Sequence, residues 1–284
     1  MSQVLELYGI STRSKRETDW MAVLSQQDCP FTDRRCIKVR KSEPDVAIAT
    51  CTVLYGRERK QVVICPYRFL ERRQIFVDCI HLLTLHEPGN ELHVVQQIPI
   101  PGGSVDYFLV SAANGKVKDF VGVELQTLDT TGTVWPARES FLREQGIEYD
   151  MNADFSKSFG MNWKMTAKTI LVQLHHKVQT FEHINKHLVL VTQDHLMDYM
   201  RREFQFEHLN AARLGDSMHF HAYRLDVTDS GAFRLNLNSR FSTDSAGITE
   251  CLGLQADPKI ELEEIISLLE SKITEDTLLA PSVR

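Results

Sequence analysis

The stretch VDYFLVSAANGKVKDFVGVELQ, residues 105–126, decides the fold of the chain. Its first part, residues 105–110, has the composition of a β-strand. Asn114-Gly115 is a strong hairpin turn signal, so residues 117–128 are expected to return as the second strand. Antiparallel pairing then places Asp106, at the beginning of the first strand, at the same end of the hairpin as Glu124.

The second strand of this hairpin ends in a carboxylate and an amide on one face. Side chains alternate along a strand, so Glu124 and Gln126 point to one side while Val123 and Leu125 point to the other. A carboxylate on a buried face is costly without a partner, so we expect a positive group to meet it. Two carboxylates held together also favour a hard cation. The alternative is an ordinary strand end that emerges into solvent.

The segments that follow alternate between helical and strand patterns. Residues 162–178 have apolar side chains at helical spacing, and the next patterns indicate a strand over 187–192, a helix over 194–202 and a strand over 217–227. The order predicts an α/β fold with a mixed central sheet flanked by helices. Residues 258–273 form an amphipathic pattern that suits core or dimer packing.

The bulk composition is that of a soluble globular protein. The chain has 284 residues, of which 43% are hydrophobic and 25% charged, enough for one large domain or two modest ones. It lacks an apolar run long enough to span a bilayer, and its beginning lacks the pattern of a signal peptide. We therefore expect a cytoplasmic protein.

The charge is unevenly distributed along the chain. The net charge is −6, yet the segment from Arg34 to Arg73 contains eleven basic and four acidic residues. From Asp244 to the end there are nine acidic and three basic residues. A basic patch on an otherwise acidic protein indicates a nucleic-acid partner, although a solvated basic face is the alternative.

Four of the six cysteines lie close together in the sequence. Disulfides are not expected in a cytoplasmic chain, and four thiolates suit zinc or iron. A hairpin formed by residues 46–55 and 61–65 brings two of them together. There is no CxxC pair, so four buried, reduced cysteines are the alternative, and Cys79 and Cys251 have the surroundings of core residues. The four candidate ligands are Cys29, Cys36, Cys51 and Cys65.

Two further stretches carry a resemblance to a known family. Asp106, Glu124 and Gln126 resemble the signature of the PD-(D/E)XK nuclease core. The block CPFTDRRCIKVRKSEPDVAIATCTVLYGRERKQVVICPYRFLERRQIF and the later NWKMTAKTILVQLHHKVQTFE resemble the NotI-type restriction endonucleases. The resemblance runs from about Cys29 to about Asp194.

This resemblance implies a function and a domain plan. It implies a homodimeric, Mg²⁺-dependent type II endonuclease that cuts double-stranded DNA at a palindromic, GC-rich site and leaves 5′-phosphates. Asp106, Glu124 and the backbone carbonyl of Leu125 would bind Mg²⁺, and the four cysteines would hold structural iron or zinc. Residues 1–66 would form the basic metal-binding module and residues 67–284 the catalytic domain. A cognate DNA methyltransferase would be encoded nearby.

Gln126 departs from the broader nuclease pattern, because most relatives have lysine there. Glutamine can position the attacking water but cannot deprotonate it. Either the metal alone lowers the pKa of the attacking water sufficiently, or another element supplies a lysine. Lys164 and Lys168 on the following helix are the candidates. Glu71, in a helix expected over residues 68–83, is a candidate further acidic ligand. Surface or phosphate-contacting lysines and a salt-bridged surface glutamate are the alternatives.

DNA contacts are expected from the cysteine module and from the loop over residues 129–138. The candidates are Arg34, Arg40, Lys41 and Arg138, since arginine and lysine contact phosphates and base edges. Two rival functions remain open: a nuclease of the same fold without strict site specificity, serving repair or defence, and a metal-stapled DNA-binding protein without catalysis. A small-molecule enzyme has no supporting cofactor motif.

Overall fold

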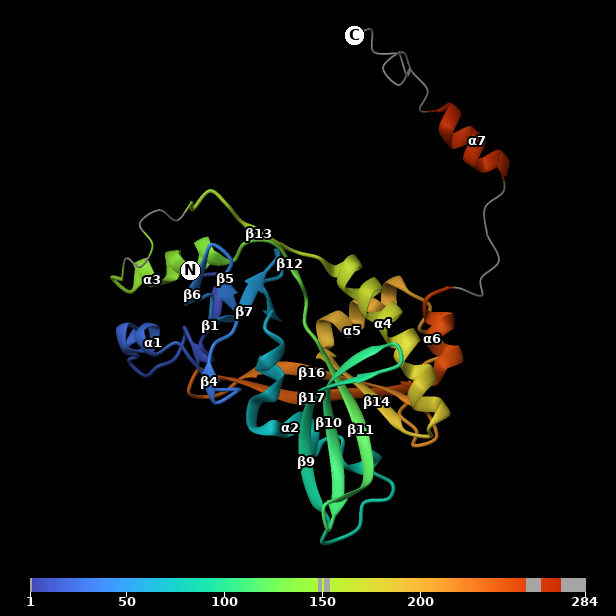
Figure 1. Ribbon diagram of the computed structural model, residues 1–284. Coiled ribbons are helices and arrows are strands. Elements are labelled where there is room, and N and C mark those ends of the chain that lie inside the picture. Colours follow the sequence, from blue (N-terminus) through green and yellow to red (C-terminus); the bar gives the residue numbers. More distant parts are fainter. Residues whose placement is uncertain (1, 148–149, 151–153, 254–261, 272–284) are drawn as a thin grey trace, which may run out of the picture.

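The computed structural model describes residues 2–147, 150, 154–253 and 262–271. Its centre is a seven-stranded mixed sheet with the strand order β15-β17-β16-β14-β11-β10-β9 (Figure 1). β14 pairs in parallel with β11 and with β16, and the remaining pairs are antiparallel. The strands are β9 (Glu91–Ile100), β10 (Gly103–Ala113), β11 (Lys116–Gln126), β14 (His187–Gln193), β15 (Asn210–Ala211), β16 (Met218–Val227) and β17 (Phe233–Thr243). The mixed α/β architecture expected from the sequence is confirmed.

The hairpin of β10 and β11 forms as its turn sequence predicts. Asn114 and Gly115 have φ values of 53° and 71°, the left-handed conformation that two-residue hairpin turns require. The strands pair in a register that places Tyr107 opposite Val123. One residue further along, Asp106 comes beside Glu124 at the end of the hairpin away from the turn.

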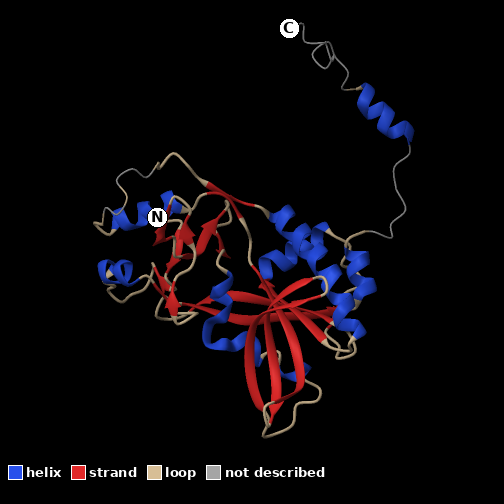
Figure 2. Cartoon of the chain, viewed as in Figure 1, coloured by secondary structure: helices blue, strands red, loops and turns tan. Residues whose placement is uncertain are grey.

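Helices cover both faces of this sheet (Figure 2). One face carries the larger apolar core, built with α4 (Trp163–His183), α5 (Asp194–Glu203) and α6 (Ser245–Cys251). The other face packs against η1 (Pro66–Arg73), α2 (Gln74–Val77) and η2 (Ile80–Leu82). Alternate side chains of β10 serve the two cores: Phe108 faces α4, and Tyr107 faces α2.

The N-terminal region forms a second, four-stranded sheet with the order β2-β1-β7-β8. The hairpin of β7 and β8 confirms the pairing expected around Cys51 and Cys65. Phe141 and Leu142 of α3 pack on this sheet, so a later segment also covers it. The two-domain division stays a prediction. The bounds are β1 (Val4–Leu7), β2 (Ile10–Ser11), β7 (Thr50–Tyr55), β8 (Lys60–Val63), α1 (Trp20–Gln26) and α3 (Trp135–Glu144), with short ladders β3 (Asp28–Cys29)/β4 (Arg34–Arg35), β5 (Val39–Arg40)/β6 (Glu43–Ala47) and β12 (Thr130–Gly132)/β13 (Phe159–Met161).

Two expected elements differ from the structure. The helix predicted over residues 68–83 is three short helical pieces, because Glu71 and Arg72 have non-helical backbone angles. The loop predicted over residues 129–138 is wrong at its end, since α3 begins at Trp135 with Pro136 in its first turn. Proline is well placed there because the first helical turn does not use its N–H.

The amphipathic segment near the end of the chain is helical as α7 (Leu262–Glu270). The rest of the predicted helix, residues 258–261 and 272–273, lies outside the described residues. Ile265, Ile266 and Leu269 are exposed, so these three apolar side chains of the helix are not part of the described core. No helix in the described ranges combines the length and apolarity needed to span a bilayer.

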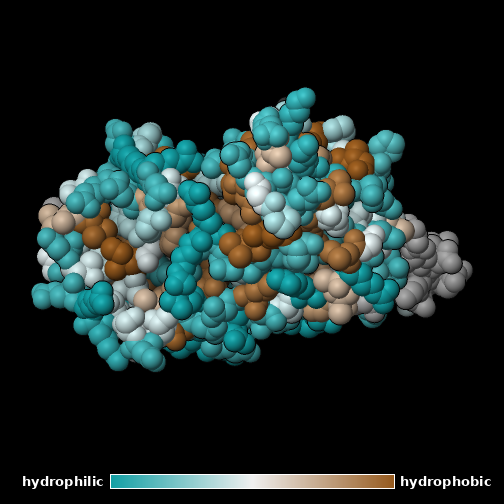
Figure 3. Space-filling view, turned by 90° about the horizontal axis from the view of Figure 1, so that it is seen from below, coloured by the Kyte–Doolittle hydropathy of each residue, from teal (hydrophilic) through white to brown (hydrophobic). Residues whose placement is uncertain are grey.

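Strand β9 forms one edge of the large sheet and is exposed along nearly its whole length. Its apolar side chains Leu92, Val94, Val95 and Ile98 are each more than a third exposed. Seen from below, this side of the molecule shows apolar patches between polar ridges (Figure 3). Pro99 removes one N–H from the edge, which limits pairing with another strand.

Candidate active site

Asp106 and Glu124 come together where β10 begins and β11 ends. The backbone N–H of Leu125 donates a 2.9 Å hydrogen bond to Oδ2 of Asp106. The backbone of Asp106 in turn hydrogen-bonds the carboxylate of Glu124. Glu124 is only 5% exposed, while Asp106 is half-buried. The hairpin thus holds two carboxylates side by side, one buried and one reachable from solvent.

The positive partner expected for Glu124 is Lys177 of α4. Its Nζ lies 2.6 Å from Oε1 of Glu124, and both side chains are almost completely buried. A buried lysine and a buried glutamate each need a partner of opposite charge, and the fold supplies both at once. The ion pair joins the second strand of the hairpin to the longest helix of the described chain.

Burial dominates the electrostatics of Glu124. Loss of water around the carboxylate, together with the charge of Asp106, raises its pKa to about 7, although Lys177 acts in the opposite direction. The outcome is a carboxyl group that titrates near neutral pH beside a lysine. Carboxylates with pKa values raised in this way are concentrated at functional sites.

Two glycines allow α4 to approach so closely. Gly102 and Gly103, in the turn between β9 and β10, have φ values of +92° and +132°. A Cβ on Gly102 would lie 2.7 Å from the carbonyl oxygen of His176, and one on Gly103 would lie 3.3 Å from Cε of Lys177. Thr180 also donates a 3.1 Å hydrogen bond to the carbonyl of Pro101. The absence of side chains at this turn therefore leaves the space that Lys177 needs to reach Glu124.

The two lysines selected from the sequence lie elsewhere on α4. Lys164 and Lys168 are exposed near the beginning of the helix, whereas Lys177 lies between two and three turns further along than Lys168. Sequence reasoning missed Lys177, although a signal was present. It is three residues after Leu174 and four before Phe181, and so lies on the buried apolar stripe, where an unpaired lysine is not tolerated.

Gln126 is half-buried at the end of β11. Its Nε2 donates a 2.6 Å hydrogen bond to the carbonyl of Thr127, which orients the carboxamide. The side-chain hydroxyl of Thr192 donates to the carbonyl of Gln126, which fixes the strand end against β14. The carboxamide can therefore position a polar group but carries no charge.

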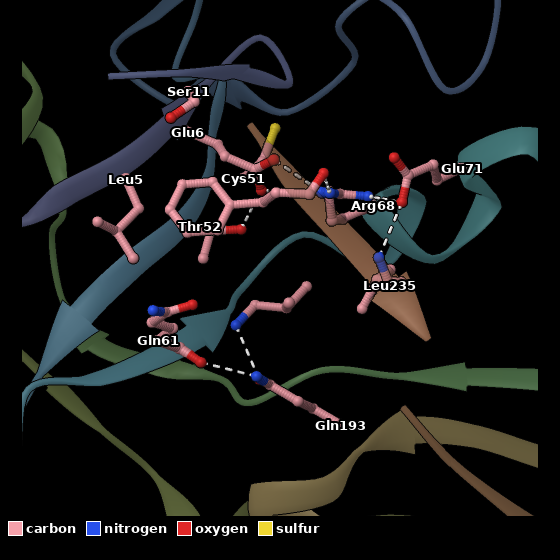
Figure 4. Close-up of polar contacts among 12 residues, drawn as sticks. Leu5, Glu6, Ser11, Cys51, Thr52, Gln61, Arg68, Glu71, Gln193 and Leu235 are labelled. Atoms are coloured by element: carbon pink, nitrogen blue, oxygen red, sulfur yellow. Dashed lines mark hydrogen bonds and ion pairs between the residues drawn. The ribbon is translucent and has the colours of Figure 1, made fainter. Parts of the chain in front are cut away.

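Glu71 takes part in a polar network with the buried Arg68 (Figure 4). One of its oxygens accepts hydrogen bonds from Nη1 of Arg68 and from the backbone N–H of Leu235. Arg68 also pairs with Glu6 at 2.8 Å, and both are 1% exposed. Glu71 thus helps to satisfy a buried arginine that ties η1 to β1 and β17.

The four candidate cysteines line one small enclosed cavity of about 10 Å³, the space that one water-sized sphere needs. Cys51 donates a hydrogen bond to Cys65, which lowers the pKa of Cys65 to about 7, and nearby Lys38 acts in the same direction. Within the described residues, no three or more His, Cys, Asp or Glu side chains are already arranged as a metal site. Four sulfurs around one cavity are nevertheless a donor set that zinc or iron accepts.

The four residues predicted to contact DNA differ in how accessible their side chains are. Arg34 and Lys41 are exposed. Arg40 pairs with Glu43 and Asp150 at 2.7 and 2.9 Å. Arg138 is fully buried and stacks on a tryptophan of its own helix, so its guanidinium does not reach a surface that DNA could touch.

The two histidines of β16 do not form a metal site within the described residues. His219 and His221 share the face of the sheet that carries η2, and both are almost completely buried. Burial lowers the pKa of His219 to about 4 and that of His221 to about 3, so both are neutral. They are core histidines.

Comparison with protein families gives a match over most of the chain. The model of the family described as "Restriction endonuclease NotI" matches residues 22–233, well over half of the chain. This range includes the four cysteines, the carboxylate hairpin and α4. No curated protein matches the chain. The chain therefore belongs to the NotI restriction endonuclease family.

Proposed function

We propose that this chain is a Mg²⁺-dependent type II endonuclease that hydrolyses double-stranded DNA at a palindromic, GC-rich site and leaves 5′-phosphates. Its sheet would be a PD-(D/E)XK nuclease core. Family membership supports site-specific restriction activity and hence DNA binding. The observation that carries the assignment of the site is the buried Glu124–Lys177 pair beside Asp106.

The residues present fit a magnesium site. Mg²⁺ is usually held by one or two carboxylates together with substrate phosphate and water, so Asp106 and Glu124 suffice, with the carbonyl of Leu125 as a further oxygen ligand. When bound, the cation would neutralise phosphate charge and supply an activated water. Glu124 is kept ready for this role by Lys177, which favours its ionised form.

Lys177 would supply the positive charge that the motif lacks at Gln126. Its ammonium group lies at the carboxylate pair, so it can stabilise the charge that develops on the phosphate. Gln126 would position the attacking water or a phosphate oxygen. Catalysis is thus divided between a helix that provides the charge and a strand end that provides orientation.

The cysteine module would serve the structure of the enzyme and its contact with DNA. Cys29, Cys36, Cys51 and Cys65 would hold iron or zinc, and Arg34 and Lys41 would contact DNA. We also propose a cytoplasmic homodimer whose host encodes a cognate methyltransferase, because unprotected sites in the host DNA would otherwise be cut.

The experiment is incubation of the purified protein with plasmid and phage DNA in Mg²⁺ or in EDTA. Glu124→Gln and Asp106→Asn keep the shape of each side chain and remove its charge. Glu17→Ala, at an exposed position remote in sequence from both carboxylates, is the control. We expect discrete bands that need Mg²⁺, persist in the control and disappear in both site variants.

Other outcomes distinguish the rival functions. A smear that depends on Mg²⁺ and Glu124 would keep the nuclease and remove site specificity. Intact DNA together with a gel shift would indicate a binding protein without catalysis. Bands that persist in Glu124→Gln would place the catalytic site elsewhere in the chain.

A further inference from the structure

A groove lies on the side of β10 that faces away from α4. Its volume is about 230 Å³, and it is bounded by the loop before β4, by η1 and α2, and by β9 and β10. Arg34 and Arg73 line it from two different segments, with Gln96 and Tyr107 on the sheet side. We call it the Arg34–Arg73 groove.

The two arginines bring unsatisfied positive charge to the groove. Both are exposed, and within the described residues neither guanidinium has an ion-pair or hydrogen-bond partner. Arg40 and Arg68, by contrast, each pair with two carboxylates. Asp33 also lines the groove, so its charged groups sum to one positive charge.

The groove lies on the same hairpin as Asp106. Tyr107 follows Asp106 directly in β10, and it lines the groove together with Arg34. The strand that begins at the carboxylate site therefore also contributes a phenol to the groove, and a phenol can donate a hydrogen bond.

The backbone on two sides of the groove is held in an unfavourable conformation. Asp33, Arg72 and Arg73 have φ values of 52°, 55° and 55°, which residues other than glycine rarely adopt. Conformations of this kind persist where the surroundings impose them, and they are concentrated at binding and catalytic sites. Here they present Arg34 and Arg73 at the same groove.

We propose that the Arg34–Arg73 groove binds a phosphate of the DNA backbone other than the phosphate that is cleaved. The planar guanidinium forks match phosphate oxygens, and Tyr107 and Gln96 offer further donors. The groove thereby helps to position the DNA from the face of the sheet opposite Lys177. This inference rests on the proposed nuclease function, which it extends to the positioning of the substrate.

The test measures binding of a short, mixed-sequence DNA duplex to the full chain by fluorescence anisotropy in EDTA over a series of salt concentrations. The variants are Arg34→Gln, Arg73→Gln and the double variant. Arg213→Gln, which removes another exposed arginine, is the control. Melting temperatures confirm that each variant is folded.

Each groove variant is expected to weaken binding about three- to tenfold and to reduce the slope of log affinity against log salt by about one. A double variant that binds with the wild-type slope overturns the inference, as does an equal loss in Arg213→Gln. Cleavage of DNA by the wild type is measured separately. If the groove variants reduce the salt dependence of binding but the wild type never cleaves DNA, the phosphate site is supported and the nuclease function fails. If the wild type cleaves DNA but the variants keep the wild-type salt dependence, the nuclease function is supported and the phosphate site fails.

Discussion

At the residue scale, the proposed function of the site depends on one lysine and one glutamate, which form a buried ion pair. Lys177 and Glu124 are each costly to bury alone, and each removes much of the cost of the other. The same burial that raises the pKa of Glu124 keeps water away and strengthens the effect of the lysine charge on anything bound there. A surface ion pair would be weak in both respects.

Lys177→Met is therefore expected to reduce DNA cleavage by about a hundredfold or more, as removal of a single charge-stabilising donor typically does. The measurement is the single-turnover cleavage rate at saturating protein. Lys164→Met and Lys168→Met are matched controls on the same helix and should retain wild-type rates. Equal losses of rate in all three variants would mean that the helix contributes only general positive charge. If Lys177→Met binds DNA as the wild type does, its loss of rate is a loss of catalysis and is not caused by misfolding.

At the element scale, the glycine turn between β9 and β10 determines how closely α4 lies to the sheet. Gly102→Ala would add a Cβ 2.7 Å from the carbonyl oxygen of His176, in addition to the cost of a positive φ. We expect a loss of about 3 kcal/mol in the free energy of unfolding. Chemical denaturation measures it.

The matched control for that change is Gly89→Ala. Gly89 has a φ of +96°, but a Cβ added there would meet no atom within 4 Å, so only the backbone cost of about 1 kcal/mol applies. Gly102→Ala should also slow cleavage, because it moves Lys177 away from Glu124. Equal stability of the two variants would contradict the close approach of α4.

The cysteine module is the second element whose role can be tested. If the four thiols hold a metal, the purified protein contains about one equivalent of iron or zinc, and Cys36→Ser loses it together with thermal stability. Cys251→Ser, in the apolar core, should lose stability and keep the metal. Elemental analysis of both variants decides between a metal site and four buried, reduced cysteines.

At the scale of the whole molecule, stability should depend on two buried histidines. The pKa values of His219 and His221, about 4 and about 3, lie below the ordinary value of 6.5 because burial disfavours their charged forms, and Arg240 adds to the effect at His221. The unfolded chain takes up these protons first. The contribution of the two neutral histidines to the free energy of unfolding is fully present above pH 6.5 and is lost as the pH falls towards 4.

Acidification from pH 7 to pH 5 is expected to lower the free energy of unfolding by at most roughly 4 kcal/mol through the two histidines together. The measurement is denaturant unfolding at both pH values. His221→Gln should reduce the difference, and His93→Gln, at an exposed histidine of β9, should leave it unchanged. A wild-type difference that survives in His221→Gln would assign the acid sensitivity to carboxylates instead.

The sequence alone determined the hairpin that carries the carboxylates, because strand alternation and the Asn114-Gly115 turn are local properties. It also indicated the mixed sheet, the long helix and the need for a positive charge opposite Glu124. Local patterns could not say which of several lysines on one helix would supply that charge. The choice of Lys177 depends on the distance and rotation of α4 over the turn at Gly102.

Only the tertiary structure decided where the remaining candidates lie. Glu71 is drawn into a network with Arg68, and Arg138 is buried with the helix that covers the N-terminal sheet. The Arg34–Arg73 groove joins segments that are remote in sequence, so no local pattern could reveal it. Local chemistry sets what each segment can form, and long-range packing sets which charged groups meet, because burial and distance determine the energy of a charge.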